Sequence, residues 1–149
     1  MKIIIICRDE NYRMYHDMLV KGGFIISDHA DLLFKEIGHQ QTTLTGKSHD
    51  GSYKLIHYDD IYLVESFAHQ VIVHTSNEEY RVKERLFEIE GIFENQNVIR
   101  INKSQIITKE NIAKIVPQFN SRLKIILKNK IVVYVTRMYL QNFRKMIGM

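Results

Sequence analysis

The residues best suited to bind an anion are concentrated in the last third of the chain. Residues 95–149 contain eleven Lys and Arg against the single acid Glu110, a net charge of +10, whereas residues 1–53 contain six Lys and Arg against seven acids. Basic charge gathered in one segment attracts a polyanion and gains affinity from the counterions that binding releases. DNA or RNA is therefore the partner class that this pattern favours, and a basic surface that serves only solubility is the alternative.

The spacings that would indicate an enzyme or a metal centre are missing from the sequence. The seven histidines form no HExxH pair, and the single cysteine, Cys7, cannot build a thiolate zinc cluster. Residues 45–48 (TGKS) match only the end of a phosphate-binding loop, because the first glycine of such a loop would fall at Gln41. The carboxylates at residues 59–60 are predicted to form a turn. We expect no enzyme activity, no cofactor, no metal and no small-molecule substrate.

The composition is that of a folded protein without a membrane anchor. A chain of 149 residues with 45% hydrophobic and 26% charged residues fits one domain, or one domain with a short appendage. The apolar run at residues 3–6 ends at the charged residues 8–10, and no later stretch approaches the roughly 20 residues that cross a bilayer. A lone cysteine, which we expect to be buried, suits a reducing compartment. These features predict a cytoplasmic protein.

The first 45 residues are predicted to form a small βαβα unit. An apolar strand over residues 1–7 precedes a helix that Asp9 or Asn11 caps and that residues 22–23 (GG) end. A second strand at residues 24–26 and a short amphipathic helix follow. The apolar side chains of that second helix are Leu32, Leu33 and Ile37. Residues 40–52 are polar, so we place a linker at 46–53, between an N-terminal segment (1–45) and a larger domain (54–149).

The larger domain is predicted to contain many short strands and two helices. Its strands cover residues 54–58, 61–65, 70–75, 79–82, 98–101, 105–108, 112–116, 123–127 and 131–135. A helix over residues 83–93 places Phe87 and Phe93 in the core, and Thr136 caps a last helix. The inner face of this last helix is expected to contain Met138, Phe143, Met146 and Ile147. Asn129 is expected to adopt the positive φ of a tight hairpin between the last two strands.

Three ordered segments within residues 54–147 resemble the LytTR family of DNA-binding domains. The first is residues 61–75, IYLVES followed by HQVIVHT after a short break. The second is residues 100–108 (RINKSQIIT), which is similar to the family's Arg-x-His-Arg/Lys-Ser-x-Ile-Val-Asn segment. The third is residues 133–139 (VYVTRMY), similar to the family's strand that ends in Ser/Thr-Arg before a last helix. Asn102 and Thr108 depart from the family's usual His and Asn.

The resemblance implies an α+β fold whose larger part is elongated, mostly β, and reads double-stranded DNA through loops between strands. The family's base-reading positions correspond to His69, Lys103 and Arg137, with Asn102 and Ser104 as phosphate contacts. Lys and Arg donate hydrogen bonds to guanine O6 and N7 in the major groove, and His can donate to a purine N7. The other Lys and Arg side chains of residues 100–145 are expected to hold phosphates.

LytTR domains commonly follow a phosphorylation receiver, and residues 1–10 are similar to the opening of one. The segment ends before it could reach the phosphoacceptor Asp, so we expect no aspartyl-phosphate switch. The appendage is expected to pack on the DNA-binding domain, to dimerise, or to sense a signal. The function that follows is a sequence-specific transcription regulator that binds paired sites as a homodimer. The alternatives are a general RNA or single-strand binding module and a protein-interaction regulator that titrates other transcription factors.

Overall fold

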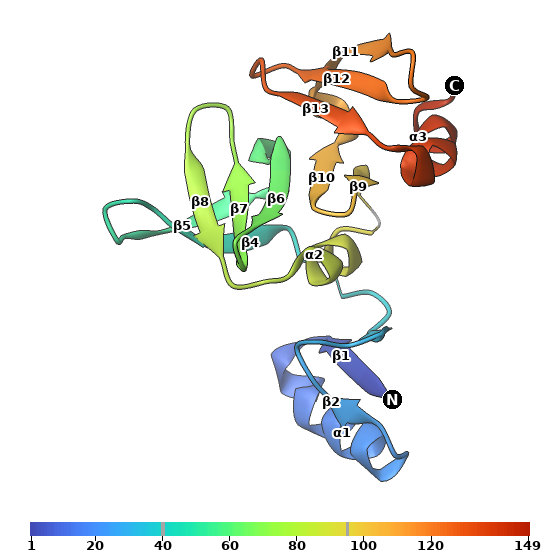
Figure 1. Cartoon of the computed structure of the whole chain (residues 1–149). Coiled ribbons are helices and arrows are strands. Elements are labelled where there is room, and N and C mark those ends of the chain that lie inside the picture. The colour runs from blue at the N-terminus through green and yellow to red at the C-terminus, as the bar shows by residue number, and fades with distance from the viewer. Residues whose placement is uncertain (40, 95) are drawn as a thin grey trace.

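The protein has an elongated arrangement of three parts (Figure 1). The computed structural model describes residues 1–39, 41–94 and 96–149. A small N-terminal unit lies at one end, a seven-stranded sheet with helix α2 (Leu86–Ile92) occupies the middle, and a three-stranded sheet with helix α3 (Leu140–Ile147) lies at the other end. The expected α+β fold class, with a mostly β larger part and a short N-terminal appendage, is confirmed.

The N-terminal unit is a three-stranded parallel sheet with one helix, in the strand order β2-β1-β3. Its elements are β1 (Lys2–Ile6), α1 (Asp9–Lys21), β2 (Ile25–Ile26) and β3 (Leu32–Lys35). The predicted second helix is wrong, because Leu32 and Leu33 belong to β3, and Ile37 is exposed beyond it. Residues 32–35 are too few to sustain a helix by themselves, and pairing with β1 provides hydrogen-bond partners for their backbone groups.

The start of α1 is held by a residue distant in sequence. Arg8 is the N-cap residue, and its side chain makes no capping hydrogen bond. The Glu36 carboxylate instead accepts from the Arg8 backbone N–H at 2.9 Å and from Asn11 Nδ2 at 2.6 Å. The hydrogen bond from the Arg8 backbone, followed by those from Asn11 and Tyr15, holds the pKa of Glu36 below its usual value. The prediction that Asp9 or Asn11 caps this helix is therefore wrong. No helix in the described ranges is long and apolar enough to span a bilayer.

Most of the polar stretch at residues 40–52 belongs to a β-hairpin. Strands β4 (Thr43–Lys47) and β5 (Tyr53–His57) pair antiparallel, with Gly46 opposite Lys54, so the residues expected to form a linker lie in this hairpin. Gln40, the first residue of the stretch, lies outside the described residues. The assignment of residues 1–45 and 54–149 to separate domains stays a prediction.

The seven-stranded sheet is antiparallel and has the order β5-β4-β8-β7-β6-β10-β9. Its remaining strands are β6 (Leu63–Phe67), β7 (Gln70–His74), β8 (Glu79–Val82), β9 (Val98–Asn102) and β10 (Gln105–Thr108). One core lies under α2 and contains Phe93, with Phe87 packed against it, as predicted. A second core lies between β9, β10 and the C-terminal sheet. Adjacent residues of β10, Ile106 and Ile107, enter different cores, so this strand is apolar on both faces.

The C-terminal sheet consists of β11 (Ile112–Pro117), β12 (Leu123–Leu127) and β13 (Val132–Val135), all antiparallel. Phe143 of α3 is fully buried against it, and Met146 and Ile147 pack on the same core as predicted. Met138 is 77% exposed, however, because Arg137–Tyr139 form a separate 3-10 turn before α3 begins. In the turn between β12 and β13 the positive φ belongs to Lys130, not to Asn129 as predicted.

The N-terminal unit packs on α2. Ile4 and Ile6 of β1 belong to the core under this helix, and the Lys35 ammonium donates to the Gly91 carbonyl at 2.8 Å. A Cβ built on Gly91 would lie 2.3 Å from Leu33 Cδ2, so the glycine permits the close approach of β3. Of the three roles expected for the appendage, packing on the larger domain is therefore realised. Cys7, expected to be buried, is half-buried.

Candidate nucleic-acid interface

Two turns of the seven-stranded sheet lie side by side at one end of it. The His69 turn (residues 67–70) joins β6 to β7, and the Lys103 turn (residues 102–105) joins β9 to β10. Strands β6 and β10 pair antiparallel, with Gln105 opposite Glu65, so both turns are at the same end. The Ser66 backbone N–H donates to the Ser104 carbonyl at 2.9 Å, which joins the two turns directly.

The His69 turn has a strained backbone. Ala68 (φ +50°) and His69 (φ +65°) both lie in the left-handed region, and Phe67 pairs directly with Gln70. A two-residue hairpin with positive φ at both positions favours Asn and Gly, and a residue with a Cβ costs roughly 1–2 kcal/mol there. His69 is exposed. Strain of this kind is concentrated at functional sites, which is consistent with the role expected for His69.

The Lys103 turn is organised by the Asn102 side chain. Asn102 Oδ1 accepts from the Ser104 backbone N–H at 2.9 Å and from the Ser104 hydroxyl at 3.1 Å. Asn102 Nδ2 donates to Gln105 Oε1 at 2.8 Å and to the Tyr134 carbonyl of β13 at 3.2 Å. Both ends of the Asn102 amide are thus occupied within the protein, while Lys103 and Ser104 are exposed. Asn102 shapes the turn that presents its two neighbours.

Arg100 is a structural part of this turn. Its Nε donates to the Asn102 carbonyl at 2.8 Å, and its two terminal nitrogens contact the Lys103 carbonyl and the Glu90 carboxylate of α2. The Arg100 side chain is 21% exposed. Each of its three nitrogens makes one of these contacts, so Arg100 holds the turn, and the phosphate contact expected of it with the other cations of residues 100–145 stays a prediction. The sequence shows the charge of Arg100 but not its partners.

Arg137 follows strand β13 and lies beside the Lys103 turn. The Thr136 backbone N–H donates to the Ile101 carbonyl at 3.0 Å, which fixes the start of the 3-10 turn against β9. Arg137 is exposed. A shallow hollow brings it together with the Lys103 turn, and its lining residues are Asn102, Lys103, Ser104, Thr136, Arg137, Met138 and Tyr139. No ion pair of Lys103 or Arg137 occurs within the described ranges, so both cations face solvent.

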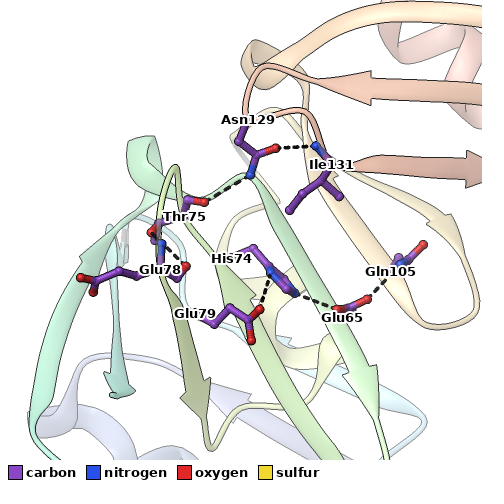
Figure 2. A network of polar contacts seen from close by, with 8 residues as sticks. All are labelled: Glu65, His74, Thr75, Glu78, Glu79, Gln105, Asn129 and Ile131. Carbon is purple, nitrogen blue, oxygen red and sulfur yellow. Dashed lines mark hydrogen bonds and ion pairs between the residues drawn. The ribbon is translucent and has the colours of Figure 1, made fainter. Parts of the chain in front are cut away.

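A network of polar side chains connects Gln105, the last residue of the Lys103 turn, to strands β6, β7 and β8 (Figure 2). His74 Nε2 lies 2.7 Å from Glu65 Oε1, and Gln105 Nε2 donates to Glu65 Oε2 at 3.0 Å. His74 Nδ1 lies 3.7 Å from Glu79 Oε1 on β8. Since a carboxylate only accepts hydrogen bonds, His74 carries its proton on Nε2 when Glu65 is ionised. The network joins β8, β7, β6 and β10 to the turn.

A side-chain contact also joins the seven-stranded sheet to the C-terminal sheet (Figure 2). Asn129, in the turn between β12 and β13, donates to the Thr75 carbonyl at 3.2 Å and accepts from the Ile131 N–H at 3.2 Å. This contact and the second core fix β13, and with it Arg137, relative to the two turns. As for metals, no group of three His, Cys, Asp or Glu suited to hold an ion occurs in the part of the chain that the structure describes.

Comparison with known proteins identifies the region that contains these turns. The family model described as the LytTr DNA-binding domain matches residues 51–148. An "Uncharacterized HTH-type transcriptional regulator" of Staphylococcus aureus (strain bovine RF122 / ET3-1) is 28% identical over 122 residues, which cover 80% of this chain and 82% of the relative. A regulator with the same description from S. aureus strain NCTC 8325 / PS 47 is 30% identical over 96 residues, 64% of this chain and 65% of the relative.

A solved structure has the same fold. It is described as the LytTr DNA-binding domain of a methyl-accepting/DNA response regulator from Bacillus cereus, with a TM-score of 0.69 and 24% identity, and the match covers 73% of this chain and 99% of that domain. The relatives are named HTH-type, but in the described ranges of this chain α2 and α3 are separated by five strands, and no two α-helices are joined by a short turn.

Proposed function

Because the chain belongs to the LytTR family of DNA-binding domains, we propose that it is a cytoplasmic transcription regulator that reads duplex DNA through its turns. The residues that contact base edges in the major groove are His69, Lys103 and Arg137. The observation that supports this proposal most is their common position: Lys103 and Arg137 line one hollow, and the His69 turn is hydrogen-bonded beside it. Three exposed donors at one end of a rigid β scaffold suit base reading, because rigid elements hold donors in register.

Each of these side chains has a distinct chemical task. Arg137 donates two parallel hydrogen bonds to guanine O6 and N7, whereas Lys103 supplies a single ammonium to the same kind of acceptor. His69 donates to a purine N7 or to a phosphate. Ser104, which is exposed, contacts a phosphate, and Asn102, whose amide donates to Gln105 and Tyr134, contributes by shaping the turn.

Phosphate contacts come from cations outside the two turns. Lys109 is exposed and follows β10, and Lys124 is half-exposed on β12. Because phosphate contacts carry no sequence information, these lysines hold the protein in register along the duplex, and the turns discriminate between bases. Affinity then falls steeply with salt, since each neutralised phosphate releases condensed counterions.

Selection of bound duplexes from a random pool tests the proposal. The expected result is a short enriched motif, with affinity for the selected duplex well above that for unrelated duplex, RNA or single-stranded DNA. Equal binding of RNA and all duplexes would favour a general nucleic-acid module. Absence of any DNA complex at low salt would favour a regulator that titrates other proteins. Both outcomes would contradict the proposed sequence-specific function.

A homodimer that binds paired sites is part of the proposal. It is supported by helix α1, where Met14 is 59% exposed, Met18 is 51% exposed and Val20 is 48% exposed. Met14 and Met18 are four residues apart and share one helix face, so they form an apolar surface suited to a second copy. Light scattering of the full chain should give the mass of a dimer, and the double change M14K/M18K should give a monomer. A parent chain that is monomeric on the selected duplex as well as free in solution would contradict this part of the proposal.

A further inference from the structure

The Lys103 turn is held by two separate sets of contacts, one centred on Arg100 and one on Gln105. Neither residue lines the hollow that contains Lys103 and Arg137. We propose that Arg100 and Gln105 are positioning residues, which keep the Lys103 turn in a single conformation so that Lys103 meets one base. This inference rests on the proposed function for the identity of the target and on the contacts described above for the turn itself.

Arg100 uses every arm of its guanidinium at this position. Nε donates to the carbonyl of Asn102, one terminal nitrogen contacts the carbonyl of Lys103, and the other contacts Glu90 on α2. Two consecutive carbonyls of the turn are thus tied to a helix that packs on the sheet. A planar fork with fixed donor directions can do this, whereas the ammonium of a lysine cannot reach three acceptors at once in the same geometry.

Gln105 connects the turn to the polar network. Its Oε1 accepts from Asn102 Nδ2, and its Nε2 donates to the Glu65 carboxylate. Glu65 is in turn held by His74, whose side chain is only 13% exposed. A continuous series of hydrogen bonds therefore runs from β7 through β6 and β10 to the Asn102 amide, which closes the turn on the Ser104 backbone. At Gln105 the donor and the acceptor of the amide are both used, so this residue links the Asn102 amide to the Glu65 carboxylate.

Positioning matters here because Lys103 has a long, flexible side chain. Four rotatable bonds make its ammonium a weak discriminator unless the backbone that carries it is fixed. When the turn is already fixed before binding, no conformational entropy of its backbone is lost as the complex with the correct base pair forms. The expected loss on freeing the turn is therefore in sequence preference and not in the affinity common to all duplexes.

Arg100→Lys separates this role from a phosphate contact. A phosphate contact would be retained by lysine, and its loss in Arg100→Ala would lower the slope of log affinity against log salt by about 0.9. The positioning role predicts instead that Arg100→Lys lowers the preference for the selected duplex over a scrambled duplex by about tenfold, near the low end of one base contact. The salt slope should stay that of the parent. Parent-like preference in Arg100→Lys would overturn the role of Arg100.

The pair Gln105 and Glu65 allows a test by restoration. Gln105→Glu places two carboxylates against each other and should open the turn. The double change E65Q/Q105E exchanges donor and acceptor, so that the new residue 65 donates to residue 105 and still accepts from His74, and it should restore the parent's preference. Asn77→Asp, the same amide-to-carboxylate change at an exposed site in the opposite turn of the sheet, is the matched control. Failure of the double variant to recover, with a folded chain, would overturn the role of Gln105.

Amide hydrogen exchange measured without DNA keeps the two proposals distinguishable. The Ser104 N–H is bonded to Asn102 Oδ1, so its exchange reports whether the turn is closed. It should quicken at least tenfold in Arg100→Lys and Gln105→Glu and recover in E65Q/Q105E. Unchanged exchange in both single variants would overturn the positioning role whatever the DNA results. If the parent chain prefers no duplex while Ser104 exchange responds as expected, the proposed function fails and the structural role of the two residues stands.

Discussion

The backbone N–H of Ser66 donates to the carbonyl of Ser104 at 2.9 Å, and this one hydrogen bond sets the His69 turn beside the Lys103 turn. Ser66 is on β6 and Ser104 lies in the turn before β10, the neighbouring strand of the sheet, although the two turns are far apart in sequence. Base edges in the major groove have fixed positions, so the donors of the two turns must be held at a fixed spacing to meet them. The family membership gives the kind of partner, and the proposed function assigns base reading to these two turns.

Arg137→Ala should lose sequence preference without loss of stability. Arg137 is exposed and forms no ion pair in the described ranges, so the free energy of unfolding should change by less than about 0.5 kcal/mol. Discrimination at one base pair should fall by about 1–3 kcal/mol. Competition between the selected duplex and its single-pair variants measures this. Lys109→Ala is the control, since it should weaken binding to every duplex alike; equal losses for all duplexes in Arg137→Ala would remove Arg137 from the base-reading set.

Ala68→Gly should stabilise the fold and leave DNA binding intact. Glycine relieves roughly 1–2 kcal/mol of strain at positive φ but costs about 0.5–1 kcal/mol in backbone entropy, which leaves a gain of up to about 1.5 kcal/mol. His69→Gly should give a similar gain in urea unfolding and lose base preference as well. Were both variants to bind the selected duplex like the parent, His69 would have no part in recognition.

The two buried glycines should respond differently to alanine. A Cβ on Gly46 would lie 2.6 Å from Tyr80 Cβ, an atom fixed to the backbone of β8, so Gly46→Ala should destabilise the fold by about 1–3 kcal/mol. The Cβ of Gly91→Ala would meet Leu33 Cδ2, which can rotate away, and the helix gains up to about 1 kcal/mol of intrinsic propensity. The melting temperature of Gly46→Ala should therefore be clearly lower than that of Gly91→Ala. A larger loss of stability for Gly91→Ala would show that Leu33 has no room to move.

Glu84 should make stability depend on pH. Burial raises the pKa of this carboxyl above its ordinary value, and its Oε2 has no hydrogen-bond partner within the described residues. A raised pKa means that the folded state keeps the proton longer than the unfolded state, so this contribution to stability is full at low pH and is lost as pH rises through the folded pKa. Glu84→Gln should therefore be more stable than the parent at pH 7 and lose that advantage towards pH 4. Identical pH profiles of unfolding in the two proteins would contradict the assignment.

The local sequence was sufficient for most strands of the larger domain, because alternation of apolar residues and turn-forming residues acts over a few positions. It failed where a distant segment decided the outcome. Leu32 and Leu33 form a strand because they pair with β1. Met138 is exposed because it lies in a 3-10 turn that precedes α3. The apolar pair Ile106-Ile107 has no alternation because β10 is buried on both faces.

The sequence by itself determined that the C-terminal part is strongly basic, that it is built of short strands, and that its motifs match positions His69, Lys103 and Arg137. Only the tertiary structure decided which charges are available. Lys103 and Arg137 face solvent, whereas Arg100 is bound to Glu90 and to two carbonyls of the Lys103 turn. The physical reason is that charge and residue type are local properties of the chain. Hydrogen-bond partners are set by the strand pairings and helix packing that bring distant residues within 3 Å of each other.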